Sequence, residues 1–352
     1  MGLLGKVFGL ENKGKIGLTV DKPSYIAGEL VVGTIYLSVF EPIECDALVV
    51  KATGKEKVKW THITNRTDAD GTVRTVEEEH DKEKEFFKQK IVVASVPTVY
   101  SPGNYMYRFE YQLPADLPGV FTMHKFSEGT MKNMDADIKY KLKATLDVGG
   151  FFAKDLKAKC LLVVHERLTQ GITPSEDATT QQVNFLCCFN KGTCTLAVAM
   201  DKNVYLPGEV AQISCRIQNS STVDIQAMRC KLLQDVTMIA DHGVRHRFTR
   251  KISEQTFPGV SAGQSVDQPQ PLPLVANTGY ESHINPSTHG RLVECTYRVD
   301  IECDIPWCPD VHLRMPELKL FRGAATVKIP IEMGAFALPA VAPGHMGDDL
   351  SF

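Results

Sequence analysis

Hydrophobic and polar residues alternate with a period of two in several parts of the chain. The clearest stretch runs from Ile138 to Val148, where apolar residues occupy every second position and mostly lysines stand between them. Successive side chains of a β-strand point to opposite faces, so this pattern predicts a strand with one buried and one solvated face. Residues 105–113 alternate in the same way, and Pro114 ends the pattern because proline cannot donate to a strand ladder.

The second half of the chain has the same character. Residues 211–217 and 295–305 alternate, and stretches of Gly, Pro, Asn and Ser separate the predicted strands. Residues 80–90, dense in Lys and Glu, are predicted as an exposed edge strand in preference to a helical turn, after a hairpin tip at 64–71. Many short strands with one wet face predict an all-β chain of two tandem immunoglobulin-like antiparallel β-sandwich lobes.

One phrase of the sequence occurs twice, 180 positions apart (201 − 21). A spacing of this length exceeds solenoid periods and indicates two copies of one domain. In each copy, at Ala27-Gly28 and Pro207-Gly208, the glycine stands at the position where a type II turn needs positive φ. We therefore interpret the phrase as a structural corner and not as a binding site. The residues of this turn motif are Asp21, Tyr25, Gly28 and Glu29, then Asp201, Tyr205, Pro207, Gly208 and Glu209.

The repeat also suggests domain boundaries. Residues 166–184 lack periodicity and are rich in Thr, Gln and Ser, which is typical of a linker. We therefore predict an N-terminal extension at 1–13, an N-terminal lobe at 14–165, the linker at 166–184, a C-terminal lobe at 185–333 and a short tail at 334–352.

Composition excludes several classes of function. The formal net charge is −3, which gives no general attraction to nucleic acid, and no apolar run is long enough for a signal peptide or a membrane span. The ten cysteines form no Cys-x-x-Cys pair, and those at Cys215, Cys295 and Cys303 fall on apolar strand phases, where buried reduced thiols are expected. A cytoplasmic protein with neither disulfides nor a zinc knuckle is predicted.

Residues for catalysis or a cofactor are not apparent. The histidines are scattered, and no Gly-x-Ser-x-Gly, His-Glu-x-x-His or phosphate-loop motif is present. His242 and His246 have the i, i+4 spacing of a helix, but Gly243 indicates a loop, and no carboxylate or thiol motif completes a metal shell there. The sequence thus predicts no enzyme, no cofactor and no metal.

Taken together, the order of motifs from Gly14 to Met333 resembles the arrestin fold, and more narrowly the α-arrestins. The resemblance is carried by residues 25–29, 101–103, 109–114, 139–144, 185–189 and 205–209. It implies a two-lobed adaptor without catalysis, which holds cytoplasmic segments of membrane proteins and recruits trafficking machinery at endosomal or plasma membranes. Direct binding of WW-domain ligases is not expected, because the sequence lacks a Pro-Pro pair. The alternative is an arrestin-like structural subunit of a coat, as in retromer.

Two further features are candidate sites. Six lysines on two predicted strands would form a face that binds anionic lipid or phosphate if the strands are neighbours. The alternative is an ordinary solvated strand face, which carries the same pattern of lysines. The adjacent Cys187 and Cys188 have an apolar surround that favours packing at the lobe junction over palmitoylation. Myristoylation at Gly2 is not expected, since Lys6 stands where Ser or Thr is required. The six lysines are Lys139, Lys141, Lys143, Lys154, Lys157 and Lys159.

Overall fold

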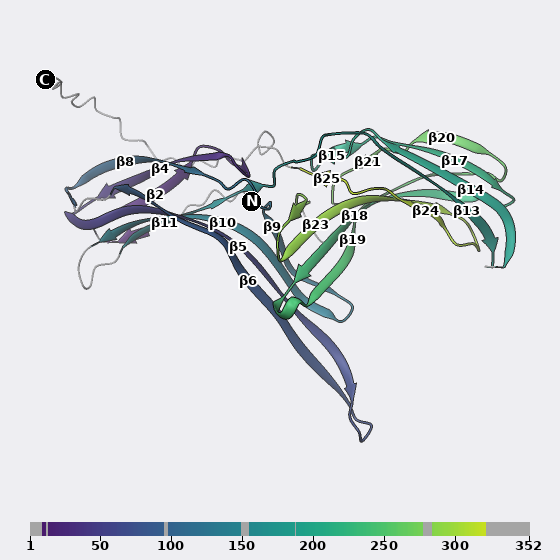
Figure 1. The fold of residues 1–352 in the computed structure, drawn as a ribbon, viewed down its shortest axis with the longest axis horizontal. Helices are drawn as coiled ribbons and strands as arrows, with labels where there is room; N and C mark the ends of the chain where they lie inside the picture. Colours follow the sequence, from purple (N-terminus) through teal and green to yellow (C-terminus); the bar gives the residue numbers. More distant parts are fainter. Residues whose placement is uncertain are drawn as a thin grey trace.

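The chain folds into two β-sandwich lobes lying end to end (Figure 1). The computed structural model describes residues 9–11, 13–94, 98–148, 155–186, 188–276 and 284–321. The strands of the N lobe are β1 Gly9–Glu11, β2 Gly14–Val20, β3 Tyr25–Ile26, β4 Leu30–Val39, β5 Ile43–Thr67, β6 Val73–Ala94, β7 Thr98–Tyr100, β8 Gly103–Gln112, β9 Phe121–Glu128, β10 Met131–Val148, β11 Leu156–Leu162 and β12 Val164–His165.

The C lobe follows the same plan. Its elements are β13 Ser175–Phe185, β14 Phe189–Met200, β15 Val204–Tyr205, β16 Val210–Ala211, β17 Ile213–Ser221, β18 Ile225–Ile239, the 3₁₀ turn η1 Asp241–Gly243, β19 Arg245–Val260, β20 Ser265–Pro269, β21 Leu272–Pro273, β22 Thr288–His289, β23 Val293–Asp304, β24 Val311–Arg314 and β25 Lys319–Leu320. The predicted all-β class with two sandwich lobes is confirmed.

Each lobe stacks two main antiparallel sheets. In the N lobe the strand orders are β1-β2-β4-β8 and β11-β10-β5-β6, with β7 and β9 added to the second sheet. In the C lobe the orders are β13-β14-β17-β20 and β19-β18-β23-β22, with β24 beside β23. The inward residues of the predicted strands fill the space between the sheets: Ile138, Tyr140 and Leu142 are all buried. Cys215, Cys295 and Cys303 are buried free thiols, as expected.

Two predicted boundaries need correction. The linker was expected to reach residue 184, but β13 spans Ser175–Phe185 and pairs along β14, so the described connection covers only 166–174. β13 is an edge strand whose residues are mostly exposed or half-exposed, so its polar sequence lacks the alternation that indicates a strand. The extension at 1–13 is also too long, because β1 pairs with β2. The predicted tail at 334–352 lies outside the described residues.

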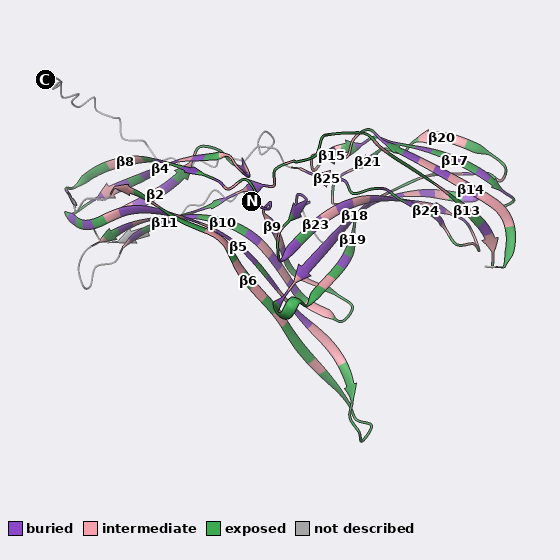
Figure 2. Ribbon diagram, in the orientation of Figure 1, coloured by how far each residue is buried: buried purple, intermediate pink, exposed green. Residues whose placement is uncertain are grey.

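The longest strands form a hairpin that leaves the body of the N lobe. β5 and β6 contain 25 and 22 residues and pair from Leu48 with Ala94 to Thr67 with Val73. Residues near the sandwich are buried on β5, whereas the outer end is exposed, as the burial colours in Figure 2 show. The edge strand predicted at 80–90 is confirmed as part of β6. The expected hairpin tip begins later than residue 64, because β5 continues to Thr67.

The turn motif makes the same corner in both lobes. Tyr25 donates its hydroxyl to Asp21, and Tyr205 donates to Asp201 at 2.6 Å. Each turn closes with a backbone bond from the final glutamate, at 2.9 Å in the first copy and 3.0 Å in the second. Gly28 and Gly208 have φ of +86° and +94°, which β-carbons disfavour. In this structure the motif lies in two corners of the scaffold.

These corners also close the lobes. The first corner strand, β3, pairs in parallel with β12, and its counterpart β15 pairs in parallel with β25. Each lobe therefore brings its last described strand back beside its first corner.

Candidate functional site at the lobe junction

The buried carboxylate of Glu56 links the two lobes. Glu56 lies on β5 of the N lobe and is 1% exposed. Its two oxygens accept hydrogen bonds from the backbone N–H groups of Arg291 and Leu292 of the C lobe, at 3.0 and 2.5 Å. A β-carbon at Gly290 would lie 2.8 Å from Oε1 of Glu56, so glycine is needed for this close approach. Glu56 thus acts as a side-chain cap for the loop before β23.

Polar groups beside Glu56 make further bonds between the lobes. Thr288 donates its hydroxyl to the carbonyl of Gly119 at 3.0 Å, and the side-chain amide of Asn285 donates to the carbonyl of Thr122 at 3.1 Å. Both acceptors belong to the N lobe, immediately before or within β9. Hydrogen bonds to backbone carbonyls fix position and direction, so these contacts set how the lobes meet.

An ion pair borders the same contact. The Nδ1 atom of His289 lies 3.0 Å from Glu166, and the backbone N–H of His289 donates to Glu166 at 2.7 Å. The hydrogen bond to Glu166 raises the pKa of His289 above its ordinary value. Burial acts to raise the pKa of Glu166, but its bonds to His289 more than offset this, and the pKa lies below its ordinary value. Both shifts favour the ionised pair.

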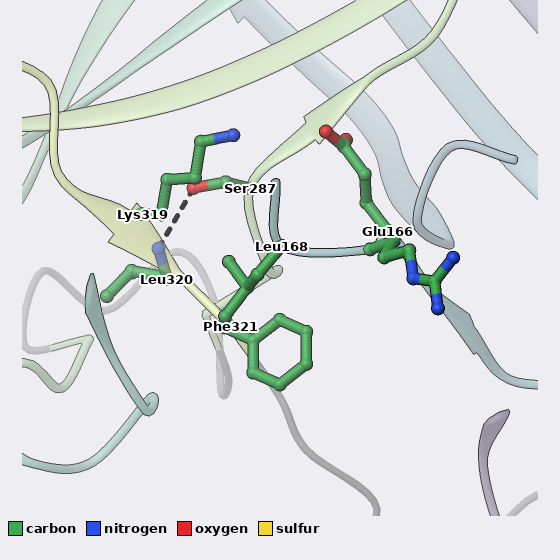
Figure 3. A pocket seen from close by; sticks show the side chains of 7 residues that line it. Glu166, Leu168, Ser287, Lys319, Leu320 and Phe321 are labelled. Atoms are coloured by element: carbon green, nitrogen blue, oxygen red, sulfur yellow. Dashed lines mark hydrogen bonds between the residues drawn. The ribbon is translucent and has the colours of Figure 1, made fainter. Parts of the chain in front are cut away.

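The cavity next to this ion pair is too small for a ligand. Figure 3 shows it between Glu166, Leu168 and Phe321, with the hydroxyl of Ser287 accepting from the backbone N–H of Leu320 at 3.0 Å. Its volume is about 10 Å³, which holds roughly one water molecule. The cavity is therefore part of the packing.

Aromatic rings from both lobes also contact one another at the junction. Trp60 of β5 is 1% exposed and lies 6.2 Å from the ring of His246 on β19. His246 stacks on Phe248 with 5.5 Å between the ring centres, and Phe248 stacks on Phe126 of β9 with 5.1 Å between the ring centres. The guanidinium carbon of Arg250 lies over the Phe126 ring, 5.0 Å from the ring centre. Two rings of the C lobe lie between two rings of the N lobe, so neither lobe completes this contact alone.

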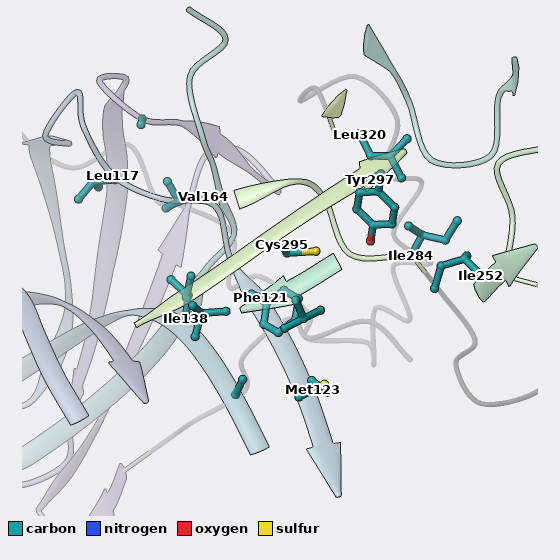
Figure 4. Packing of buried hydrophobic residues seen from close by; sticks show 14 of the residues in the cluster. Leu117, Phe121, Met123, Ile138, Val164, Ile252, Ile284, Cys295, Tyr297 and Leu320 are labelled. Carbon is teal, nitrogen blue, oxygen red and sulfur yellow. The ribbon is translucent and has the colours of Figure 1, made fainter. Parts of the chain in front are cut away.

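The apolar core is continuous across the junction. Phe121 and Ile138 of the N lobe belong to the same buried cluster as Cys295 and Tyr297 of the C lobe (Figure 4). Burial of apolar area between lobes favours a fixed arrangement over independent motion.

A wide groove runs from the end of β9 over the outer face of the C lobe. Its volume is about 520 Å³, and Glu128, Asp235, Arg247, Arg298 and Arg314 are among the residues that line it. Arg298 forms an ion pair with Asp235, and both Arg298 and Arg314 approach Asp300, at 3.3 and 3.7 Å. Each of the three arginines thus lies within 4 Å of Asp235 or Asp300, so none of them is left without a carboxylate to bind an anion.

The predicted lysine row is part of a larger surface. Lys143 stands directly opposite Lys159 of β11 and Lys51 of β5, and Lys51 stands opposite Lys90 of β6. Contact with Lys88 holds the pKa of Lys51 below its ordinary value. We call this surface the lysine face, and it consists of Lys51, Lys88, Lys90, Lys139, Lys141, Lys143, Lys157 and Lys159.

Only part of the lysine face is neutralised. Lys139 pairs with Asp137 at 2.8 Å, Lys157 with Asp155 at 3.0 Å, and Lys88 with Glu85 at 3.6 Å. The other five lysines have no carboxylate within 4 Å among the residues that the structure describes. Lys154 lies outside those residues. The sequence could not assign Lys51, Lys88 and Lys90 to this surface, because their placement depends on the register of β5 with β10 and β6.

The adjacent cysteines do not lie where packing at the junction would require. The turn between β13 and β14 is at the outer end of the C lobe (Figure 1), and Cys188 in that turn is exposed. Leu186, Phe189 and Trp307 beside it are also exposed, and the N–H of Leu186 donates to the carbonyl of Trp307 at 3.0 Å. The expected burial at the lobe junction is wrong for Cys188, and Cys187 lies outside the described residues.

A histidine cluster was missed by the sequence analysis. His62, Glu78 and His80 offer ligand atoms within 4.8 Å of one another, although β5 and β6 bring them together from distant positions. The motif search tested spacings along one segment, whereas this cluster arises from hairpin register.

No helix among the described residues has the length and hydrophobicity to cross a membrane.

Comparison with known proteins agrees with this architecture. The chain matches the family models described as Arrestin (or S-antigen), N-terminal domain, over residues 15–167, and Arrestin (or S-antigen), C-terminal domain, over residues 190–334. It is 28% identical to Arrestin domain-containing protein A of Dictyostelium discoideum over 316 residues, which are 89% of this chain and 52% of that protein. It is 24% identical to Arrestin domain-containing protein 4 of Homo sapiens over 226 residues, 62% of this chain and 49% of that protein.

The chain spans about half the length of these relatives. Both family models match in chain order, one on each sandwich lobe. The chain belongs to the arrestin-domain-containing proteins.

Proposed function

We propose that this protein is a cytoplasmic, non-enzymatic adaptor of the α-arrestin type, which binds cytoplasmic segments of membrane proteins during endocytic sorting. The main support is the convergence of three hairpins at the lobe junction. The β5–β6, β9–β10 and β18–β19 hairpins leave the body on the same side in Figure 1. Because the hairpins come from both lobes, a partner bound there would sense how the lobes are arranged.

The long hairpin offers a specific way to bind a peptide. β6 forms the end of its sheet, so one edge of this 22-residue strand pairs with no other strand of the described chain. An extended peptide can add to such an edge through main-chain hydrogen bonds. Alternating Lys and Glu along β6 oppose uncontrolled self-association of that edge. We propose that cargo segments bind by β-augmentation at the outer end of β6, nearest the hairpin tip.

Shortening the hairpin tests this proposal. Replacing residues 65–75 with Asn-Gly would join the paired Thr64 and Val76 through a two-residue turn. The removed residues are exposed or half-exposed, so we expect an unchanged melting temperature. In proximity labelling in cells, the shortened variant should lose the membrane proteins that the wild type labels.

A control variant keeps the hairpin length and changes only its tip, with Asp68→Asn and Asp70→Asn. It should retain the labelled set. Recovery of one stoichiometric complex without membrane proteins would instead favour the alternative, a retromer-like structural subunit. Equal labelling by the shortened and wild-type proteins would reject the hairpin as the cargo site.

We further propose that the lysine face lies against an anionic membrane while cargo is bound. A basic side chain near such a surface contributes about 1 kcal/mol. Reversing Lys141, Lys143 and Lys159 to Glu should therefore weaken sedimentation with phosphatidylserine vesicles by at least roughly 100-fold. The matched control places the same charge change on the C lobe, at Lys191, Arg216 and Lys251. Equal sedimentation of wild type and lysine-face variant would contradict the proposal.

Acylation of Cys188, which the sequence favours less than packing, is a further proposal. Its exposure permits modification, and an acyl-exchange assay that finds no thioester on this residue would remove it.

A further inference from the structure

The inner part of the β5–β6 hairpin carries a set of metal-ligating side chains on one face. His62 is paired with Glu78, and Trp60 is paired with His80, across the two antiparallel strands. Residues two apart on a strand share a face, so both histidines and the carboxylate point to the same side. Their ligand atoms all lie within 4.8 Å of one another.

The separations need little adjustment to bind an ion. Ligand atoms on a tetrahedral zinc ion, with bonds of about 2.0–2.1 Å, lie about 3.4 Å apart. Nε2 of His80 is 3.9 Å from a carboxylate oxygen of Glu78. Side-chain movements of roughly 1 Å would therefore bring the three ligand atoms to zinc distances, and the exposed Glu78 can make most of this movement by a rotamer change.

The surroundings favour a cation with nitrogen ligands. His80 is largely shielded, with 13% of its side chain exposed, and its ring lies 5.3 Å from that of buried Trp60. Lys82 lies two residues along β6, but its ammonium group faces Asp241 of the C lobe at 3.5 Å. That positive charge is paired and does not oppose a bound cation.

A further histidine approaches from the C lobe. Nε2 of His246 is buried and has no hydrogen-bond partner among the described residues. An imidazole nitrogen without a hydrogen-bond partner is free to accept a metal ion.

We propose that His62, Glu78 and His80 form a binding site for a divalent zinc-class ion, whose fourth coordination position faces His246 or solvent. Two imidazoles and one carboxylate are ligands that zinc prefers, whereas magnesium and calcium prefer sets made of oxygen. The site lies where the long hairpin meets η1 and β19 of the C lobe. A bound ion would stiffen the base of the hairpin. This inference does not depend on the adaptor role.

Trp60 provides a direct test in the full chain. Trp307 is 76% exposed, so Trp307→Phe should leave the fold intact and make Trp60 the single tryptophan. Titration with Co²⁺, a paramagnetic stand-in for zinc, should quench Trp60 fluorescence saturably with one ion per chain. Zn²⁺ should reverse the quenching. The near-ultraviolet Co²⁺ spectrum should lack a thiolate charge-transfer band, which separates this site from the free cysteines.

Variants of the ligands complete the test. In the same background, His62→Gln with His80→Gln should weaken Co²⁺ binding by more than the roughly 10–100-fold typical of losing an outer-sphere partner. Glu78→Gln should also weaken binding. Because the Glu78 side chain is exposed, we expect this variant to fold as the parent does. His312→Gln, at an exposed histidine of β24, should bind as the parent does.

Two results would overturn the proposal. One is the absence of saturable quenching of Trp60 in the Trp307→Phe protein. The other is binding of unchanged affinity in Glu78→Gln and in the double histidine variant, with a thiolate band that assigns the ion to cysteine. If the double variant fails to fold, Glu78→Gln alone decides the question.

Discussion

Glu56→Ala is expected to lower the free energy of unfolding by about 1–3 kcal/mol through the buried N–H of Leu292, with a smaller loss from the partly buried N–H of Arg291, because both groups lose their acceptor. The two groups belong to Arg291 and Leu292 on the other lobe. The loss should therefore fall first on the contact between the lobes. Chemical denaturation measures the total, and hydrogen exchange at the amides of residues 291 and 292 shows where protection is lost.

Two variants calibrate this result. Glu56→Gln retains one carbonyl oxygen and should lose less stability than Glu56→Ala. Glu44→Ala removes an exposed carboxylate from the same strand and should change stability by no more than about 0.5 kcal/mol. If Glu56→Ala unfolds at the wild-type denaturant concentration with unchanged exchange at these amides, Glu56 does not hold the lobes together.

Trp60→Ala is expected to cost about 3–5 kcal/mol, as is usual when a large aromatic side chain is removed from a packed core. Trp60 is 1% exposed and its ring neighbours are His80 and His246. Its loss removes a ring from the contact between the hairpin and the C lobe. Thermal and chemical unfolding both measure the effect.

The other tryptophan is a matched control. Trp307 is 76% exposed, so Trp307→Ala should change stability by no more than about 0.5 kcal/mol. Equal losses from the two substitutions would show that the aromatic contact at the junction contributes nothing beyond surface packing.

The sequence was sufficient for the architecture because strand burial has a period that can be read locally. The stretch 138–148 is half-buried as its alternation predicted, and the duplicated turn forms a corner in each lobe. Prediction failed where a strand buries little of either face. β13 lies at a sheet edge with many exposed polar residues, so its sequence looked like a linker.

The functional surface was less accessible to sequence reasoning. Glu56 stands among charged residues of β5, and nothing nearby in the sequence indicates that it binds backbone groups 235 positions away. The same limit applies to His62 and His80, which only a strand register brings together. Contacts between lobes depend on how two separately folded surfaces meet, and local periodicity carries no information about that.

The two small parallel strand pairs have a consequence for folding. Val164 pairs with Tyr25 after 139 intervening steps of chain (164 − 25), and Lys319 pairs with Val204 after 115 (319 − 204). Each pairing closes a loop the size of a whole lobe, and contacts between distant residues slow folding because their loop entropy must be overcome first. During synthesis, the first corner of each lobe must wait for the final strand of that lobe to leave the ribosome. Nascent chains of this protein therefore expose unfinished sheet edges for longer than a helical protein of equal length, and those edges are natural binding sites for chaperones.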